Sequence, residues 1–221
     1  MAPIRSISLY LSVMLLLSGC AFYDVKVNGF MDSSNYSKVK PGASITVVDD
    51  IKAVNSIQEK EVKAKIEKLL KLKGYKIGTF RDSDYFLLFG YGVGSGQTVS
   101  GSLPIIQPGD SAPVSTIGTY RAAMSTIYLP ETPVIIPNSQ TVYRKWLLLK
   151  LIDGDHYRDT NEARDVWIGE VTSTSFSSDI RVVIDYLLIS AFEHFCENTG
   201  KQVTETISEG DDRVRDLASS Q

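Results

Sequence analysis

The stretch that decides the fold is Val142–Ile152, VYRKWLLLKLI, followed by Asp165–Ser173, DVWIGEVTS. The first run has a strongly apolar centre at 146–149, and both runs are rich in the apolar and β-branched residues that favour strands. The polar segment between them, Asp153–Arg164, is typical of a connection. The two runs therefore predict a pair of antiparallel strands joined as a hairpin.

A helix is predicted directly after this hairpin, at about 178–196. Ser177 or Ser178 can cap it, and Asp179 would stand in the first turn, where the helix dipole favours a carboxylate. A wide apolar stripe follows at Ile180, Ile184, Leu187, Leu188, Ala191, Phe192 and Phe195. The charged segment 208–221 beyond it is expected to be a flexible tail.

A second helix is predicted at about 56–73, upstream of the hairpin. Ser56 can act as its N-cap, with Glu59 at the capping-box position three residues later. One face carries apolar residues at helical spacing, namely Val62, Ile66, Leu69 and Leu70, with Lys73 at its edge. The remaining lysines are interpreted as a solvated face, in preference to a patch that binds a membrane surface.

Shorter β-prone runs lie at 22–30, 43–48, 75–80, 84–93 and 119–129. Together with the two helices they predict an α+β fold in which two main helices pack on a mostly antiparallel sheet. We expect one domain at 20–207, interrupted by a Gly/Ser/Pro-rich excursion at 94–118.

Glycines recur at every second position where this excursion begins, at Gly90, Gly92, Gly94 and Gly96. On a strand they would leave one face bare and allow another backbone to approach. We interpret the excursion as a contact surface, with Gly94, Gly96 and Gly101 as candidate contact residues. An alternative is self-assembly, in which Asp84–Gly96 pairs with another chain at a sheet edge.

The N-terminus has the organisation of an export signal. One cation, Arg5, precedes an apolar run at Ile7–Leu17 that is too short to cross a bilayer. Leu17-Ser18-Gly19-Cys20 then resembles the lipobox of bacterial lipoproteins. The resemblance implies a signal peptide at 1–19, cleavage between Gly19 and Cys20, and a diacylglycerol thioether on the Cys20 sulfur.

The lipobox resemblance also implies an amide-linked acyl chain such as palmitate on Cys20, and two acyl chains give stable anchoring in a bilayer. In the sorting rule of that family, Asp after the cysteine retains the protein in the inner membrane. Ala21 therefore favours the outer membrane, with the domain facing the periplasm.

The catalytic inventory of the mature chain is sparse. Its only histidines are His156 and His194, and no G-x-S-x-G motif is present, which disfavours a Ser/His/Asp triad. His194 is expected to be exposed. The candidate metal ligands are Asp153, Asp155 and His156, with Asp159 nearby, but Asp and Gly are also what turns prefer, so a turn is the favoured interpretation.

Other residues with possible chemistry have structural interpretations. Cys196 is predicted to be a small buried hydrophobe. Trp146 and Trp167 are interpreted as core residues in preference to platforms for ligand stacking. The glycines from 90 to 96 do not fit a phosphate-binding loop. A net charge of −3 disfavours nucleic-acid binding, and no cofactor is expected.

Several short motifs resemble a family of bacterial envelope lipoproteins known only as a domain of unknown function. They are the lipobox, Leu69–Tyr75, Asp84–Leu87, and Leu149–Asp153 followed by Val166-Trp167-Ile168-Gly169. The resemblance implies helices on a mostly antiparallel sheet and no established activity. The favoured function is a non-enzymatic binding or structural accessory of the cell envelope. The alternatives are an envelope hydrolase or metal-binding protein that uses Asp153, Asp155 and His156, and the self-assembling component.

Overall fold

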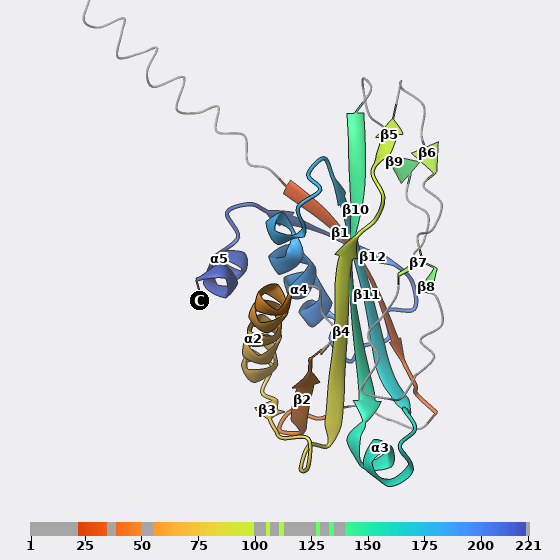
Figure 1. The fold of residues 1–221 in the computed structure, drawn as a ribbon, viewed down its shortest axis with the longest axis vertical. Coiled ribbons are helices and arrows are strands. Elements are labelled where there is room, and N and C mark those ends of the chain that lie inside the picture. The colour runs from red at the N-terminus through yellow and green to blue at the C-terminus, as the bar shows by residue number, and fades with distance from the viewer. Residues whose placement is uncertain are drawn as a thin grey trace, which may run out of the picture.

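The computed structural model describes residues 22–34, 39–49, 55–99, 105–106, 111–112, 127–128, 133–134 and 140–219. Its centre is one mixed sheet with the strand order β12-β1-β11-β10-β4-β2-β3 (Figure 1). The bounds are β1 Phe22–Met31, β2 Ser44–Val48, β3 Lys76–Ile77, β4 Tyr85–Val93, β10 Gln140–Asp153, β11 Asp165–Ser175 and β12 Val203–Ser208. A further strand, β5 (Gln97–Val99), pairs with the start of β10.

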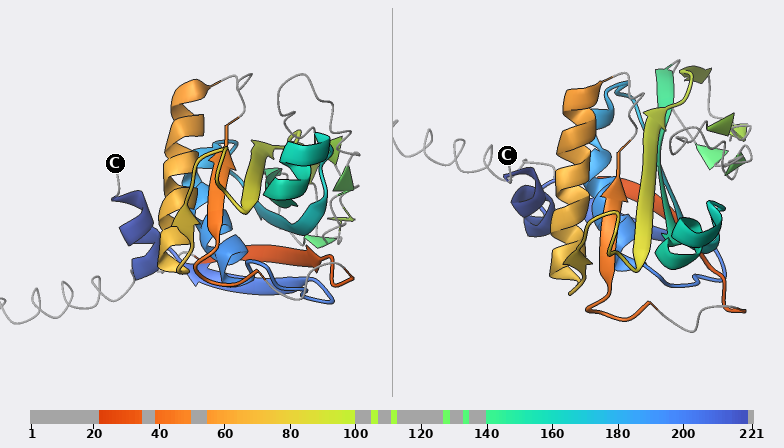
Figure 2. Two further views of the ribbon diagram at one scale, coloured as in Figure 1. Left: turned by 90° about the horizontal axis from the view of Figure 1, so that it is seen from below. Right: turned by 60° about the horizontal axis from the view of Figure 1, so that its bottom comes forward.

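Most of the helices cover one face of this sheet (Figure 2). They are α2 (Ser56–Leu72), the short 3₁₀ helix η2 (Ile180–Val182), α4 (Ile184–Glu193) and α5 (Asp212–Ala218). Another helix, α3 (Gly154–Thr160), lies at the lower end of β10 in Figure 1. The main core lies between the sheet and α2 and α4, and α4 itself is buried from Ile184 to Phe192.

The predicted hairpin is confirmed as the middle of the sheet. β10 pairs antiparallel with β11 from Tyr143 to Ile152 and with β4 from Lys145 to Asp153. Leu147, Leu149 and Leu151 belong to the main core on the helix side. β10 is therefore paired along both edges and buried on the helix side.

The α+β class is confirmed, but the sheet is mixed. β2 runs parallel to both β4 and β3, whereas the other neighbouring strands of the main sheet are antiparallel. The parallel arrangement follows from α2, because a helix that crosses over between two strands of one sheet returns the chain in the same direction. The strand expected at 75–80 is reduced to Lys76–Ile77.

The helices begin and end at other residues than the sequence predicts. Asn55 caps α2, with its side chain accepting a hydrogen bond from the backbone of Gln58, so Ser56 is the first helical residue. Glu59 is buried and hydrogen-bonds Tyr91 on the sheet, and burial together with this bond raises the pKa of Tyr91. Its carboxylate thus links α2 to β4.

The helix that follows β11, α4, is shorter than the helix expected at 178–196. The Ser177 hydroxyl accepts from the backbone of Asp179, and the Asp179 carboxylate accepts from the backbone of Arg181. These local bonds favour a turn and a 3₁₀ helix, so α4 begins only at Ile184. It ends at Glu193 with His194 as its C-cap, and Cys196 beyond it takes a left-handed conformation with φ of 60°.

Two segments expected to be irregular contain regular structure. The connection 153–164 includes α3, and residues 208–219 hold α5 where a flexible tail was expected. In α5, Val214 and Leu217 share one face and are buried, and α5 contacts α4. One apolar pair in a charged segment is too weak a signal for sequence-based prediction.

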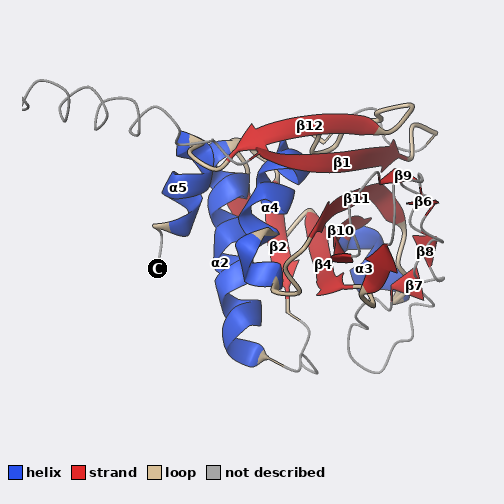
Figure 3. Ribbon diagram, turned by 90° about the horizontal axis from the view of Figure 1, so that it is seen from above, coloured by secondary structure: helices blue, strands red, loops and turns tan. Residues whose placement is uncertain are grey.

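Of the excursion, residues 94–99 are described and include β5, and between there and β10 the structure describes four short strands. They are β6 (Ile105–Ile106), β7 (Ser111–Ala112), β8 (Ile127–Tyr128) and β9 (Pro133–Val134), and they lie on the side of the sheet away from the main helix layer (Figure 3). The rest of the excursion at 94–118 and of the strand expected at 119–129 falls outside the described residues. Among the helices that the structure describes, none has the length and apolar character needed to cross a bilayer.

A buried ion pair joins α2 to α4 beneath the surface of the helix layer. The Lys65 ammonium lies 2.8 Å from an Asp185 carboxylate oxygen and 2.8 Å from Glu61. The Lys65 and Asp185 side chains are only 6% and 12% exposed. Burial alone would lower the pKa of Lys65, but the hydrogen bonds to Asp185 and Glu61 outweigh it and raise the pKa.

Asp185→Ala should lower the free energy of unfolding by about 2 kcal/mol, because the buried Lys65 ammonium loses one of its two carboxylate partners and keeps only Glu61. The double variant Lys65→Met/Asp185→Leu should recover most of that loss, since it removes both charges and keeps the volume. Urea unfolding followed by circular dichroism measures both effects. Equal losses of unfolding free energy in the two variants would show that the missing charge partner of Lys65 is not the cause.

Candidate functional site

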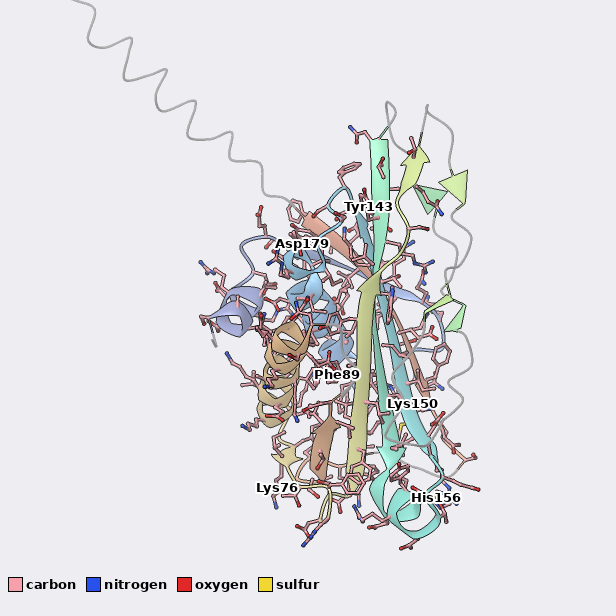
Figure 4. The ribbon with its side chains drawn as sticks, viewed as in Figure 1. Lys76, Phe89, Tyr143, Lys150, His156 and Asp179 are labelled. Atoms are coloured by element: carbon pink, nitrogen blue, oxygen red, sulfur yellow. The ribbon has the colours of Figure 1, made fainter. Side chains whose placement is uncertain are left out.

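The candidate metal ligands lie on α3 at one end of the molecule, where Figure 4 labels His156. Asp153 is the N-cap of α3 and accepts a hydrogen bond of 2.9 Å from the backbone of His156. Asp155 is exposed and forms an ion pair with Arg158 one turn later. The predicted turn is therefore a capped helix, and two of these carboxylates have structural partners.

Gly154 explains why α3 starts where it does. A Cβ at this position would lie 2.5 Å from the backbone oxygen of Ser83, and the Gly154 amide donates to the Asp84 oxygen at 2.8 Å. Arg158 holds the same turn by donating to the Ser83 oxygen at 2.7 Å. No cluster of three or more His, Cys, Asp or Glu side chains suited to a metal ion occurs among the residues described.

The alternating glycines make room for aromatic rings of the same chain. A Cβ on Gly92 would lie 2.8 Å from the Trp146 ring, and one on Gly96 would lie 2.6 Å from the Tyr143 ring. Gly94 donates its amide to the Arg144 oxygen at 2.8 Å. The space at Gly92 and Gly96 is therefore filled by side chains of β10, and not by the backbone that the sequence led us to expect. Gly101, Gly19 and Cys20 lie outside the described residues.

The strand proposed for self-assembly is paired along one edge and over part of the other. β4 pairs with β10 along its whole length, and its residues 85–88 also pair with β2. The strands at the ends of the described sheet order are β12 and β3. On the β2 side, the register with β2 stops at Leu88, before the second half of β4.

His194 is half-buried, contrary to the expectation that it is exposed. Its Nε2 lies 2.8 Å from Glu205 on β12, and its Nδ1 lies 3.7 Å from Glu197. Cys196 is buried as predicted, and burial raises the pKa of its thiol to about 12. Such a thiol is almost fully protonated at neutral pH, which makes it a poor nucleophile. Trp146 and Trp167 are also buried, as expected.

The sheet face away from the main helix layer carries a group of charged residues. Arg144 is 3% exposed, and its charge lowers the pKa of the nearby Lys26, together with the larger effect of burial. Burial raises the pKa of Glu170, while a hydrogen bond with Asn28 and the charge of Arg144 act in the opposite direction. This face is therefore polar and partly buried.

One cavity among the described residues is a groove of about 360 Å³ between α2, α4 and α5. We call it the helix groove. Its apolar lining residues are Leu69, Leu72, Ile189, Phe192 and Leu217, and its charged ones are Lys68, Lys73, Glu193, Arg213 and Asp216. Cavities of this size with an apolar floor and a few polar groups are typical binding sites for small molecules.

The charges around the helix groove are partly committed to one another. Arg213 pairs with Glu193 and Asp211, each at 2.8 Å, and Lys68 donates to the backbone oxygen of Asp216. These contacts tie α5 to α4 and α2 and so form one wall of the groove. The groove joins segments from residues 68–73, 189–193 and 213–217, so no local motif marks it.

No family model matches the chain, and no curated protein matches it either. Among solved structures, it is similar to a PDZ domain protein from Parabacteroides distasonis, with 14% identity and a TM-score of 0.47. The match covers 91% of this chain and 42% of that protein, so the chain spans less than half of its length.

The chain is also similar to the PelC dodecamer from Paraburkholderia phytofirmans. The identity is 11% and the TM-score 0.40, over 78% of this chain and 99% of that one. TM-scores as low as these do not establish a shared fold.

Gly92→Ala should lower the free energy of unfolding by about 1–3 kcal/mol, because the added methyl group overlaps the Trp146 ring. Gly210→Ala is the matched control, since a Cβ there meets nothing within 4 Å. Combining Gly92→Ala with Trp146→Leu should cost less than the sum of the single changes. Strict additivity in denaturant unfolding would contradict this contact.

Proposed function

We propose that the chain is a lipid-anchored protein of the bacterial envelope, held on the outer membrane through Cys20 and facing the periplasm. The observation that carries this proposal is the lipobox Leu17-Ser18-Gly19-Cys20 after a short apolar run. The resemblance to the envelope lipoprotein family agrees with it. The domain then begins almost at once, since β1 starts at Phe22.

We further propose that the domain acts by binding and not by catalysis. The arrangement of the candidate catalytic groups supports this, because Asp153 caps a helix and Asp155 pairs with Arg158. Cys196 is buried with a raised pKa, and His194 lies between two glutamates. Each of these groups has a structural role in the fold.

Cys20→Ser should abolish both lipidation and cleavage, because the hydroxyl cannot replace the thiol as the acceptor of diacylglycerol. The expected product is an unprocessed precursor that takes up no labelled palmitate. Cys196→Ser is the matched control, and it should be processed and labelled like the parent. Normal cleavage and labelling of Cys20→Ser would refute the anchor.

A second candidate function is the binding of a small anionic amphiphile in the helix groove. The apolar floor would take a hydrocarbon chain or ring, while Lys68 and Lys73 supply positive charge at the rim. Leu72 is 73% exposed on this floor, which leaves it available to a ligand.

Leu72→Glu should weaken binding of anilinonaphthalene sulfonate by about tenfold, which corresponds to ~1.4 kcal/mol. The reason is that a carboxylate replaces apolar floor and repels the sulfonate. Ile57→Glu is the control, because Ile57 is on the same helix, 80% exposed and outside the groove lining. Fluorescence titrations that are the same for both variants and the parent would argue against this site.

A further inference from the structure

Three of the exposed large hydrophobic side chains in the described part of the chain gather at one end of the sheet. They are Phe22, Phe176 and Val182, with exposed fractions of 64%, 59% and 44%. The register of the strands brings Phe22 and Phe176 to the same end, because Val25 of β1 lies opposite Ser173 of the antiparallel β11. Val182 is the last residue of η2, which follows Phe176 in the chain. The start of β1 and the segment after β11 are therefore at the same end, the upper one in Figure 1. We call these three residues the apolar end.

The backbone beneath the apolar end is held firmly. Phe22 pairs with Ser208 of β12, so β1 is hydrogen-bonded from its first residue. The Tyr23 ring packs on Tyr186 of α4, with ring centroids 4.1 Å apart. Burial and the neighbouring Tyr23 raise the pKa of Tyr186, which keeps its hydroxyl neutral. The exposure of Phe22 is thus a property of a fixed strand.

Covalent geometry places this end close to the lipid anchor. Only Ala21 stands between Cys20 and Phe22, and an extended chain covers at most about 3.5 Å per residue, or roughly 7 Å over these two steps. That distance is about the thickness of the headgroup region of one leaflet, roughly 5–7 Å on each side of the hydrocarbon core. With Cys20 acylated, the segment before β1 is too short to hold the domain at a distance from the bilayer.

We propose that the apolar end is the face on which the domain rests on the membrane, with Phe22, Phe176 and Val182 entering the interfacial layer. The inference rests on the proposed lipidation of Cys20 and adds to it an orientation of the domain. Phe is among the side chains that enter the boundary between headgroups and acyl chains when a protein surface lies on a membrane. The partner proposed for this surface is a lipid bilayer, because acylation of Cys20 would hold the apolar end beside the membrane.

The charges at this end indicate which kind of lipid surface fits. Asp179 and Arg181 form a pair there, and hydrogen bonds from Arg181 hold the pKa of Asp179 at about 2, so both stay charged. Asp24 and Asp211 add negative charge near the paired ends of β1 and β12, with Arg213 bonded to Asp211. No surplus of cations is present among these residues. Contact should therefore depend on apolar insertion and not on anionic lipids.

The experiment uses the acylated full-length chain in vesicles, with an environment-sensitive fluorophore attached through Phe176→Cys or Val182→Cys. Phe80→Cys is the matched control, because Phe80 is 49% exposed and precedes β4 at the opposite end of the sheet. The parent chain serves as the blank, because any fluorophore it takes up is attached to the buried Cys196. Nitroxide-bearing lipids in the vesicles quench fluorophores that lie in the membrane.

We expect quenching at Phe176→Cys and Val182→Cys to be severalfold stronger than at Phe80→Cys, and unchanged when anionic phosphatidylglycerol is added. If the protein floats with the vesicles but all three labels are quenched equally, the orientation is wrong and the anchor stands. Shielding of the labels by a second protein, without quenching by lipid, overturns the orientation too. A protein that carries no acyl chain and does not float overturns both proposals.

Discussion

The rest of the structure depends on the burial of β10. This strand of 14 residues is paired with β11 on one edge and β4 on the other, and its side chains alternate between two unlike faces. Leu147, Leu149 and Leu151 require an apolar cover, which α2 and α4 provide. On the reverse face, Trp146 needs space, and Gly92 provides it. The positions of the neighbouring strands and of the helix layer follow from these two requirements.

A second close contact decides how the chain returns to the sheet after α4. A Cβ on Gly29 would lie 2.5 Å from the Glu197 oxygen, so glycine lets the turn at 197–199 lie directly on β1. Trp167 donates to that same oxygen at 2.9 Å, and the Thr199 amide donates to the Gly29 oxygen at 3.1 Å. The turn then leads into β12, which pairs with β1. These contacts make β1 an internal strand and fix its first residue in place.

Much of the fold can be predicted from hydrophobic pattern, and the departures have local causes. Alternation and β-branched residues place β1, β2, β4, β10 and β11, and helical spacing places α2. The α3 helix is missed because the same Asp and Gly residues that favour a turn here cap and start a helix. β12 and α5 are missed because their stability comes from β1 and α4, far away in sequence. The helix groove combines three distant segments, so it has no sequence signal of its own.

The proposed tether at Cys20 and the length of the sheet would together set how far from the membrane each part of the domain lies. A strand rises about 3.3 Å per residue, so β10 spans about 45 Å from one end of the sheet to the other. A domain held at the start of β1 would carry α3 at the far end of this span, in the periplasm. The exposed Asp155, paired with the partly buried Arg158, would then face outward, where a partner can reach it. The helix groove lies on the flank, between α2, α4 and α5, and would stay open to small molecules at any distance from the bilayer. Because the proposed anchor leaves almost no linker, the orientation and reach of the domain would be properties of the fold itself.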